Sequence, residues 1–383
     1  MGATLKHSEF EKAKSGFVAN KPQQSSSLHA DCYTDKKYLN VEQKAIFEKT
    51  WQWACHSEKL RENGNYFVKD IAGNSILMIR NSQGNLRAFY NVCQHRAHEL
   101  LSGEGKTQTI VCPYHAWCYD LDGTLRSARH TEHVEAFDKS DICLHSVQIE
   151  EFCGFVYINL DPDAESLSKQ TGNLAQEISE FVADVNKLTF AHRLTFEIKS
   201  NWKNVVDNFL ECYHCPTAHR DFCSLLDFET YKVTTHGIYS SHMAKGGNVN
   251  NSAYSTEGAT VDDHAVWWLW PNTCLMRYPG RGNFLVMSVT PDGPDRTLET
   301  YDFFFETSKP TGQEWEAIKY IKEVLQQEDI DIVESVQRGM KTPAFEFGRI
   351  VHDPAGSGLS EHGVHHFHGL VIDTYAKAVS YTE

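Results

Sequence analysis

Two short clusters of cysteine and histidine in the first third of the chain could hold a metal. The first cluster contains Cys93 and His95, and the second, after sixteen intervening residues, contains Cys112 and His115. Zinc fingers usually offer their cysteines as one pair and their histidines as another. Here each cluster supplies one of each, the order of a Rieske [2Fe–2S] centre, in which two thiolates bind one iron and two imidazoles bind the other. The sequence therefore predicts such a cluster.

The segments around these four residues predict a small β-domain. Residues 66–90 contain short apolar runs separated by A-G-N and S-Q-G-N turns, and the segment W-C-Y-D-L-D-G-T-L follows the second cluster. Such runs, bounded by Gly, Asn and Asp, are typical of strands and hairpins. We expect a hairpin that turns at Asp122 and Gly123, and two ligand loops that meet at one tip of the domain.

A second metal site is predicted by N-W-K-N-V-V-D-N-F-L-E-C-Y-H-C-P-T-A-H, residues 201–219. Asn201 is a candidate helix cap, and apolar residues follow it at helical spacing. Glu211 and His214 would share a helical face, and His219 follows Pro216, where the chain can leave the helix and fold back. Two histidines and one carboxylate form the facial triad of non-haem Fe(II) oxygenases, so we expect His214 and His219 to bind iron.

The carboxylate of that triad must come from elsewhere in the chain. An amphipathic stretch at residues 315–324 leads into Q-Q-E-D-I-D-I-V-E-S-V-Q-R-G-M, which predicts a long helix. Glu328, Asp329 and Asp331 all lie on or beside this helix. The residues alone leave the choice among them open.

The two signatures together resemble the α subunit of Rieske non-haem iron oxygenases over nearly the whole chain. One departure is Ala116, where the family usually has glycine after the last cluster ligand. The resemblance implies Asp329 as the iron ligand, because the family's carboxylate is followed by Glu and then Gln, here Glu334 and Gln337. It also implies Glu211 as an electron bridge between a cluster histidine and an iron histidine of neighbouring subunits in a ring-shaped homotrimer. Asp207 is a further candidate for supporting the iron site.

The implied fold class is α+β, with a small all-β Rieske domain and a larger catalytic domain that has an antiparallel sheet flanked by helices. We expect residues 1–45 to form an N-terminal arm and helix of the catalytic region, residues 46–160 the Rieske domain, and residues 161–383 the catalytic domain with mononuclear iron.

The substrate class is also suggested by resemblance. The compact length, Glu211 in place of the commoner aspartate, and the H-H-F-H near the end resemble the group that oxidises choline, glycine betaine, stachydrine or carnitine. The implied reaction uses O2 to hydroxylate and N-demethylate a small quaternary ammonium compound such as glycine betaine, with release of formaldehyde. The alternatives are a choline or carnitine monooxygenase, an aromatic-ring-hydroxylating dioxygenase α subunit, and, outside enzymes, a ferredoxin-like electron carrier.

A quaternary ammonium group has no N–H to donate, so aromatic faces and distant carboxylates must bind it. Alternation along a strand would place Trp268 and Trp270 on one face and Trp267 on the other, although core packing explains each tryptophan equally well. The candidate pocket residues are Phe209, Tyr213, Trp268, Trp270 and Tyr278.

The chain has no G-x-G-x-x-G dinucleotide signature. We therefore expect NADH electrons to arrive from a separate reductase that carries flavin and a [2Fe–2S] cluster. A formal charge of −15, without a basic run, argues against nucleic acid as a partner.

Several features predict a cytoplasmic address. The longest apolar run, A-V-W-W-L-W, is far below the roughly 20 residues that cross a bilayer, and the N-terminus lacks a secretory apolar core. The scattered cysteines, Cys212 and Cys215 among them, are expected to be reduced thiols. The histidines at positions 362, 365, 366 and 368 are expected to lie on a helix and to bind no metal.

Overall fold

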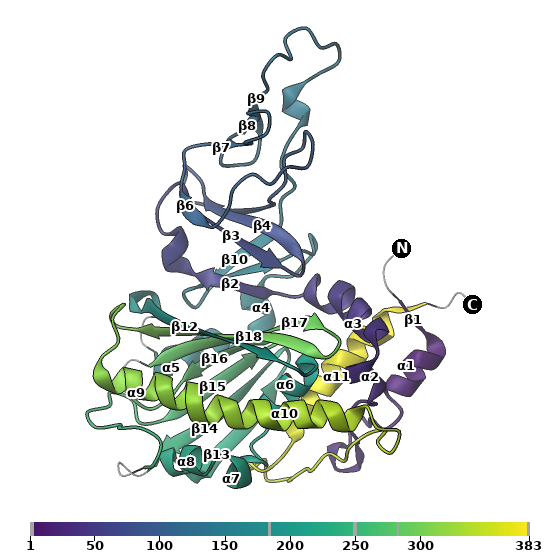
Figure 1. Ribbon diagram of the computed structural model, residues 1–383, viewed down its shortest axis with the longest axis vertical. Helices are drawn as coiled ribbons and strands as arrows, with labels where there is room; N and C mark the ends of the chain where they lie inside the picture. The colour runs from purple at the N-terminus through teal and green to yellow at the C-terminus, as the bar shows by residue number, and fades with distance from the viewer. Residues whose placement is uncertain (1–3, 183–184, 248–250, 282, 381–383) are drawn as a thin grey trace. The chain divides into compact units, whose positions relative to one another are not determined.

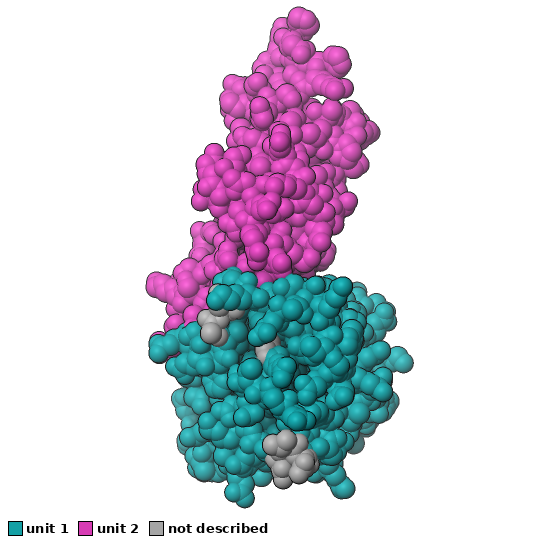
Figure 2. All heavy atoms as spheres, turned by 90° about the vertical axis from the view of Figure 1, so that its left-hand side faces the viewer, with its two compact units in different colours: residues 1–46, 176–383 teal, residues 47–175 magenta. Residues whose placement is uncertain are grey.

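The computed structural model describes residues 4–182, 185–247, 251–281 and 283–380. The chain divides into two compact units, which Figure 2 shows in different colours. Residues 47–175 form the cluster unit, and residues 1–46 together with 176–383 form the catalytic unit. The cluster unit extends beyond residue 160 because the Glu150 carboxylate accepts the backbone N–H groups of Leu167 and Ser168, which fastens the segment that follows to this unit.

The cluster unit is built from short antiparallel strands in three sheets, with strand orders β10-β11-β2, β5-β4-β3-β6 and β7-β8-β9. Gly123 occupies the expected turn between β8 and β9, with φ of 90°. A Cβ at that position would lie 2.7 Å from the Phe89 ring, so the turn needs glycine. The strands are β2 (Gln52–His56), β3 (Asn65–Ile71), β4 (Asn74–Arg80), β5 (Leu86–Tyr90), β6 (Glu104–Lys106), β7 (Ile110–Val111), β8 (Cys118–Tyr119), β9 (Leu125–Ser127), β10 (Gln148–Phe152) and β11 (Phe155–Asn159); short helices are η3 (Ser57–Leu60), η4 (Lys139–Asp141) and α4 (Leu167–Thr171).

The catalytic unit contains a seven-stranded antiparallel sheet with the order β12-β18-β17-β16-β15-β14-β13. Figure 1 shows α9 and α10 running across one face of this sheet. The strands are β12 (Thr189–Ile198), β13 (Leu226–His236), β14 (Tyr239–Gly246), β15 (His264–Leu269), β16 (Thr273–Arg277), β17 (Phe284–Gly293) and β18 (Arg296–Phe305). The combination of this sheet, its helices and the all-β cluster unit confirms the α+β class.

Helices lie on both faces of the sheet, with α5 on one face and α11 on the other. They are α5 (Leu174–Phe181), η5 (Val185–Lys187), α6 (Trp202–Phe209), α7 (Cys215–Ala218), α8 (Arg220–Leu225), α9 (Gly312–Tyr320), the π-helical turn η6 (Ile321–Leu325), α10 (Gln326–Met340) and α11 (His362–Lys377). The N-terminal segment contributes β1 (Leu5–Lys6), α1 (His7–Ala13), η1 (Pro22–Gln24), α2 (Asp31–Thr34), α3 (Lys36–Glu42) and η2 (Gln43–Phe47), and β1 pairs in parallel with β19 (Val379–Ser380).

The three tryptophans of 267–270 follow the expected alternation. The Trp267 ring meets Phe181 of α5 edge-on, on one face of the sheet. Trp268 and Trp270 lie on the other face, where their rings pack 5.6 and 5.8 Å from the Phe367 ring of α11. All three side chains are buried, so they form the contacts that hold helices on both sides of the sheet.

A buried ion pair fastens the N-terminal segment to the catalytic unit. The Lys203 Nζ of α6 lies 2.7 Å from Glu42 Oε1, and both side chains are fully buried. The other Glu42 oxygen accepts the Trp202 Nε1–H at 2.7 Å, and the Tyr375 hydroxyl of α11 also donates to Glu42. This carboxylate therefore joins α3, α6 and α11.

Replacing Glu42 with Gln should lower the free energy of unfolding of the catalytic unit by about 3–5 kcal/mol, because the Lys203 ammonium would stay buried without its counter-charge. Urea denaturation followed by tryptophan fluorescence measures the change. Glu11→Gln is the matched control, since Glu11 pairs with Lys14 at the exposed surface of the same unit and its loss should cost below about 1 kcal/mol. Equal effects of the two variants would contradict a special role of the buried pair.

Candidate metal centres and adjoining cavity

Helix α6 leads into the segment that carries the predicted iron ligands. Its N-terminus is capped as expected, since the Asn201 side chain accepts the Lys203 backbone N–H at 3.0 Å. The helix, however, ends at Phe209, so Glu211 and His214 do not lie on one helical face. Instead the Glu211 carboxylate accepts the backbone N–H groups of Tyr213 and His214, a local bond that replaces the helical one.

The turn after α6 also corrects our expectation for its cysteines. Cys212 and Cys215 are joined in a disulfide, with their Cα atoms 4.9 Å apart, and reduced thiols were predicted. Helix α6 ends at Phe209, before these cysteines. The Cys212 and Cys215 side chains therefore meet across the turn that contains Tyr213 and His214. The disulfide closes a loop around His214.

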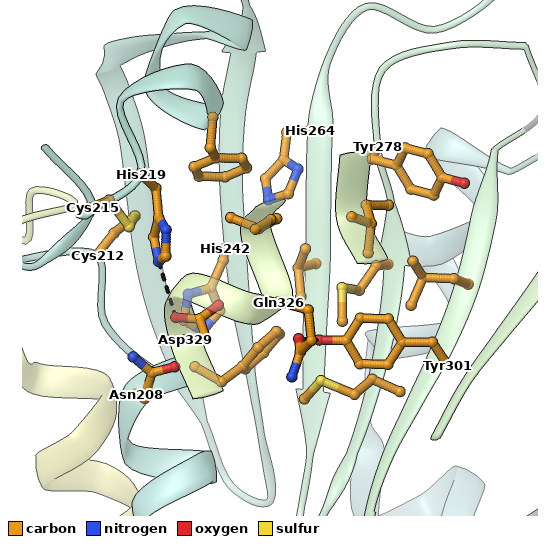
Figure 3. A pocket seen from close by; sticks show the side chains of 18 of the residues that line it. Asn208, Cys212, Cys215, His219, His242, His264, Tyr278, Tyr301, Gln326 and Asp329 are labelled. Atoms are coloured by element: carbon orange, nitrogen blue, oxygen red, sulfur yellow. Dashed lines mark hydrogen bonds and ion pairs between the residues drawn. A yellow bond between two sulfur atoms is a disulfide. The ribbon is translucent and has the colours of Figure 1, made fainter. Parts of the chain in front are cut away.

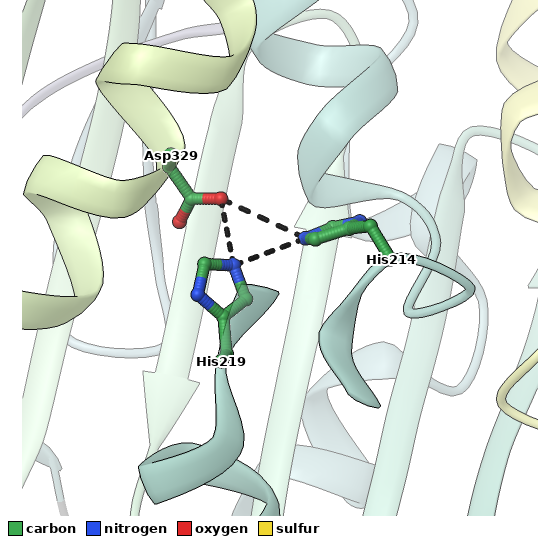
Figure 4. Close-up of side chains that lie close together, drawn as sticks. All are labelled: His214, His219 and Asp329. Carbon is green, nitrogen blue, oxygen red and sulfur yellow. Dashed lines mark hydrogen bonds and ion pairs between the residues drawn. The ribbon is translucent and has the colours of Figure 1, made fainter. Parts of the chain in front are cut away.

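His214, His219 and Asp329 come together in space, as Figure 4 shows. The two Nε2 atoms of the histidines are 3.1 Å apart, and Asp329 Oδ1 lies 2.9 Å from His219 Nε2 and 3.6 Å from His214 Nε2. Two imidazoles and one carboxylate match the donor set of a mononuclear Fe(II) site. The residues present therefore fit the metal that the sequence predicts.

The electrostatics of this cluster favour a bound cation. Burial lowers the pKa of His214, but hydrogen bonds with Asp329 and Glu211 outweigh that effect and raise it to about 10. Burial likewise raises the pKa of Asp329, yet its hydrogen bonds with His214 and His219 bring it below the usual value. Positive charge is thus stabilised where the three side chains meet, whether it is carried by a proton or by a metal.

Two further carboxylates orient the histidine rings. Glu328 Oε2 lies 2.8 Å from His219 Nδ1, and Glu211 Oε1 accepts from His214 Nδ1. A carboxylate on the second nitrogen fixes the tautomer and the orientation of a metal-binding imidazole. Of the three acids left open by the sequence, Asp329 thus meets the ligand nitrogens, Glu328 supports a ligand, and Asp331 accepts from Gln327 at 2.9 Å. The role of Glu328 was missed because its partner is 109 residues away in the chain.

Gln337 and Glu334 hold α10 against the start of α6. Gln337 Oε1 accepts the Asn201 backbone N–H and the Asn204 side-chain amide, both at 2.8 Å. Glu334 Oε1 accepts the Lys199 backbone N–H at 3.0 Å. These bonds position Asp329, which lies on the same helix, over the two histidines.

Asp207 has a different environment from the one expected. Its carboxylate accepts the Tyr33 hydroxyl at 2.7 Å and lies 2.9 Å from His368 Nε2 of α11. In the part of the chain that the structure describes, the neighbour of His214 on α6 is Asn208, whose Nδ2 is 3.4 Å from His214 Nε2. Asp207 therefore links α6 to α2 and α11, and Asn208 takes the place beside the iron site.

The four predicted cluster ligands lie on two matching loops of the cluster unit. His95 Nδ1 and His115 Nδ1 are 3.1 Å apart, and Cys93 and Cys112 are buried. In each loop the cysteine carbonyl accepts a backbone N–H four residues later, from Ala97 and Ala116, both at 3.0 Å. This donor set fits a [2Fe–2S] cluster held by two thiolates and two imidazoles.

Ala97 and Ala116 both have a φ of 57°, the left-handed region that favours glycine. A non-glycine residue there costs roughly 1–2 kcal/mol, which gives a physical reason for the family's glycine after the last ligand. Tyr119 is a residue that the sequence analysis missed. Its hydroxyl lies 3.3 Å from Cys93 Sγ and accepts the Gln94 N–H at 3.1 Å, so it can tune a cluster sulfur.

A cavity adjoins the iron triad between the sheet and helix α10 (Figure 3). Phe209 and Tyr278, two of the predicted pocket residues, line it. The other three do not: Tyr213 is half exposed on the turn, and Trp268 and Trp270 are buried against α11. The sequence missed most of the rings that do line it, namely Phe222, Tyr231, His242, Tyr254, His264, Tyr301 and Tyr320.

The charge of this lining is one-sided. No lysine or arginine occurs among its described residues, whereas Glu211, Glu299 and Asp329 contribute carboxyl groups. The two histidines on the sheet are neutral, because burial lowers the pKa of His242 to about 3 and that of His264 to about 4. The cavity is therefore aromatic and acidic, a surrounding that suits a cation.

The four C-terminal histidines each contact a different partner. His362, His365 and His366 contact the backbone carbonyls of Val233, Val18 and Gly237, and His368 contacts Asp207.

None of the helices that the structure describes combines the length and apolar composition needed to cross a membrane.

Comparison with known proteins agrees with this geometry. Residues 185–377 match the family model of the ring hydroxylating α subunit (catalytic domain), and residues 50–138 match that of the Rieske [2Fe–2S] domain. The chain is 40% identical to the carnitine monooxygenase oxygenase subunit of Escherichia coli (strain K12) over 361 residues, which cover 94% of this chain and 96% of that protein. It is 34% identical to the chloroplastic choline monooxygenase of Amaranthus tricolor, over 88% of this chain and 75% of that protein.

A solved structure shows the same similarity. A quaternary ammonium Rieske monooxygenase, described in terms of carnitine oxidation by gut microbiota and inter-subunit electron transfer, superposes with a TM-score of 0.87 at 35% identity. The match covers 97% of this chain and 100% of that one.

Replacing Asp329 with Ala should remove mononuclear iron from the protein, because the anionic ligand between the two histidines is lost. The [2Fe–2S] absorption should survive, since its ligands belong to the other compact unit. Iron-to-sulfide ratios of the purified variants measure the loss. Asp331→Ala is the matched control on the same helix and should retain iron; if it lost iron while Asp329→Ala kept it, the assignment of the ligand would move.

Proposed function

The chain belongs to the α subunits of Rieske non-haem iron oxygenases, as its metal-binding patterns predicted, and from this premise we propose that it oxidises a small quaternary ammonium compound with O2. The reaction we propose first is hydroxylation of an N-methyl group of a glycine betaine-like substrate. The hemiaminal that results collapses to formaldehyde and the demethylated amine. The observation that carries the substrate class is the aromatic, acidic cavity beside the triad, which lacks lysine and arginine among its described residues.

The lining favours a cation without N–H groups for physical reasons. Aromatic faces attract such a cation through their quadrupole, and the attraction strengthens when water is excluded. A neutral arene could pack against the same aromatic rings, but it would leave the cavity's carboxyl groups without a counter-charge. The names of the curated relatives, carnitine and choline monooxygenase, support the same class.

A second candidate is oxidation of choline at its alcohol carbon, which gives an aldehyde hydrate and no formaldehyde. One observation favours it: the described lining offers no lysine or arginine to a substrate carboxylate, and His242 and His264 are neutral. Burying an unpaired carboxylate is costly, whereas a hydroxyl tail could bond to the buried Tyr278 and Tyr320 hydroxyls, which have no side-chain partner in the described structure. Carnitine is the remaining alternative within the class.

The bound metals would supply single electrons and the activation of O2. His214, His219 and Asp329 would hold the mononuclear iron, and Cys93, His95, Cys112 and His115 would hold the cluster. We propose that NADH electrons reach the cluster through a separate flavin/[2Fe–2S] reductase and that the protein works in the cytoplasm.

Glu211 is proposed as the bridge for electrons between the two centres. One of its oxygens bonds to His214 Nδ1, and its other oxygen accepts two backbone N–H groups, so its position beside the iron site is fixed. His95 is exposed on its own unit and available to a partner. A homotrimer in which Glu211 meets a cluster histidine of the adjacent copy completes the proposal, in keeping with the inter-subunit electron transfer described for a solved relative.

A panel of substrates tests the proposed function. Purified protein with a generic NADH-dependent reductase should consume O2 with a quaternary ammonium compound and not with naphthalene or toluene. Formaldehyde from glycine betaine or carnitine would mark N-demethylation, and aldehyde from choline would mark the second candidate. Turnover of arenes in the absence of any activity on quaternary amines would overturn the proposal.

Replacing Glu211 with Gln should leave both metals bound and still stop turnover, because a neutral amide no longer supports His214 as a charged acceptor. Single-turnover measurements on the pre-reduced protein should show that cluster oxidation by O2 and substrate slows by at least about tenfold. Glu229→Gln is the control, because Glu229 is exposed on strand β13 of the same unit. Normal cluster oxidation in Glu211→Gln would remove the bridge from the proposal.

A further inference from the structure

One buried carboxyl group in the cavity is not used by the metal centre. Glu299 lies on β18 with 1% of its surface exposed, and its side chain lines the cavity. Its side-chain partner is the Gln326 amide, which donates from Nε2. By contrast, Asp329 meets both histidines and Glu211 meets His214. Glu299 is therefore the carboxyl group of the described lining that remains without a cationic partner.

An ionised carboxylate is costly at such a place. Burial raises the pKa of Glu299 to about 8, and the negative charge of the neighbouring Asp329 adds to the rise. Buried charges are normally tolerated when an opposite charge accompanies them. A cation entering the cavity would supply that opposite charge.

The hydrogen bonds around Glu299 fix it relative to the iron site. Gln326 donates to Glu299 and accepts the Tyr301 hydroxyl, so one amide holds both side chains in the cavity wall. Figure 3 shows Gln326 beside Tyr301. Gln326 and Asp329 are three residues apart at the start of α10 and share a helical face. A group bound at Glu299 would therefore lie close to the iron ligand Asp329.

We propose that Glu299 is the counter-charge for the substrate's quaternary ammonium head group and that it selects cations over neutral molecules of the same shape. The inference rests on the proposed function and deepens it. Glu299 would act as a specificity-determining residue that brings an N-methyl group, or the carbon beside nitrogen, toward the iron. The surrounding rings, Tyr301 among them, would supply the cation–π contacts that a single carboxylate cannot.

The test compares each quaternary ammonium ligand with a carbon isostere that lacks the positive charge on nitrogen. Choline is paired with 3,3-dimethylbutan-1-ol, and glycine betaine with 3,3-dimethylbutanoate, in which carbon replaces the charged nitrogen. Isothermal titration calorimetry on the iron-loaded, anaerobic full-length protein gives the dissociation constants. The wild type should prefer the cation, and Glu299→Gln should reduce that preference by at least about tenfold while the isostere binds as before.

Glu197→Gln is the control, because Glu197 is exposed on strand β12 of the same sheet and is not among the residues that line the cavity. Its ratio of cation to isostere affinity should equal that of the wild type. Equal weakening of both ligands by Glu299→Gln would show a merely structural role and overturn the inference. An unchanged ratio in Glu299→Gln would overturn it too.

A second variant keeps the inference testable if Glu299→Gln does not fold. Glu299→Asp retains the charge but withdraws it from the cavity, so it should lose part of the cation preference and none of the isostere affinity. An equal loss for both ligands would count against the inference. The proposed function fails separately: wild-type protein that neither binds nor oxidises any quaternary amine would refute it, whereas turnover with an unaltered preference in the variants would refute the role of Glu299 alone.

Discussion

The contact between Asp329 and the two histidines of the α6–α7 segment is the interaction on which the catalytic unit depends. It joins side chains that are more than a hundred residues apart in the chain. Hydrogen bonds from Gln337 and Glu334 stabilise it, because they hold α10 against the start of α6. Helix α6 is itself fixed to the N-terminal segment by the buried ion pair between Glu42 and Lys203. A series of polar contacts, several of them buried, thus runs from the N-terminal segment to the metal ligands.

Charge balance explains the character of the cavity. Carboxyl groups of Glu211, Glu299 and Asp329 face a space lined by aromatic and aliphatic side chains, with no lysine or arginine among the residues described there. Such a surrounding penalises every uncompensated negative charge. In the proposed function, iron compensates the carboxyl groups around the triad, and the substrate cation compensates Glu299. One physical constraint therefore connects the choice of metal site with the choice of substrate.

The turn between α6 and α7 interrupts the helix and positions the iron ligand His214. Glu211 takes backbone N–H groups that a continuing helix would use, and the disulfide between Cys212 and Cys215 closes the turn around His214. The result aims His214 at His219 while its second nitrogen stays on Glu211. The cluster loops contain backbone strain, because Ala97 and Ala116 adopt the positive φ that favours glycine.

The family and the fold class were predictable from the sequence, because the patterns that indicate them have short, fixed spacing: a Cys and a His in each of two loops, and His214 five residues before His219. What lay beyond local spacing was decided by tertiary structure. The helix that was expected to carry Glu211 ends at Phe209, and the Glu211 side chain accepts the Tyr213 backbone N–H instead. The residues alone left Asp329, Glu328 and Asp331 open; the family resemblance selected Asp329, and the direction in which α10 presents the three side chains gives the physical reason. The residues of the cavity wall were the hardest to predict. Glu299 and Tyr301 belong to no sequence motif, and the sequence does not distinguish Trp268, which lies outside the cavity, from an aromatic residue that lines it. Their roles follow from which strand, which face and which covering helix surround them, and no pattern of neighbouring residues encodes that arrangement.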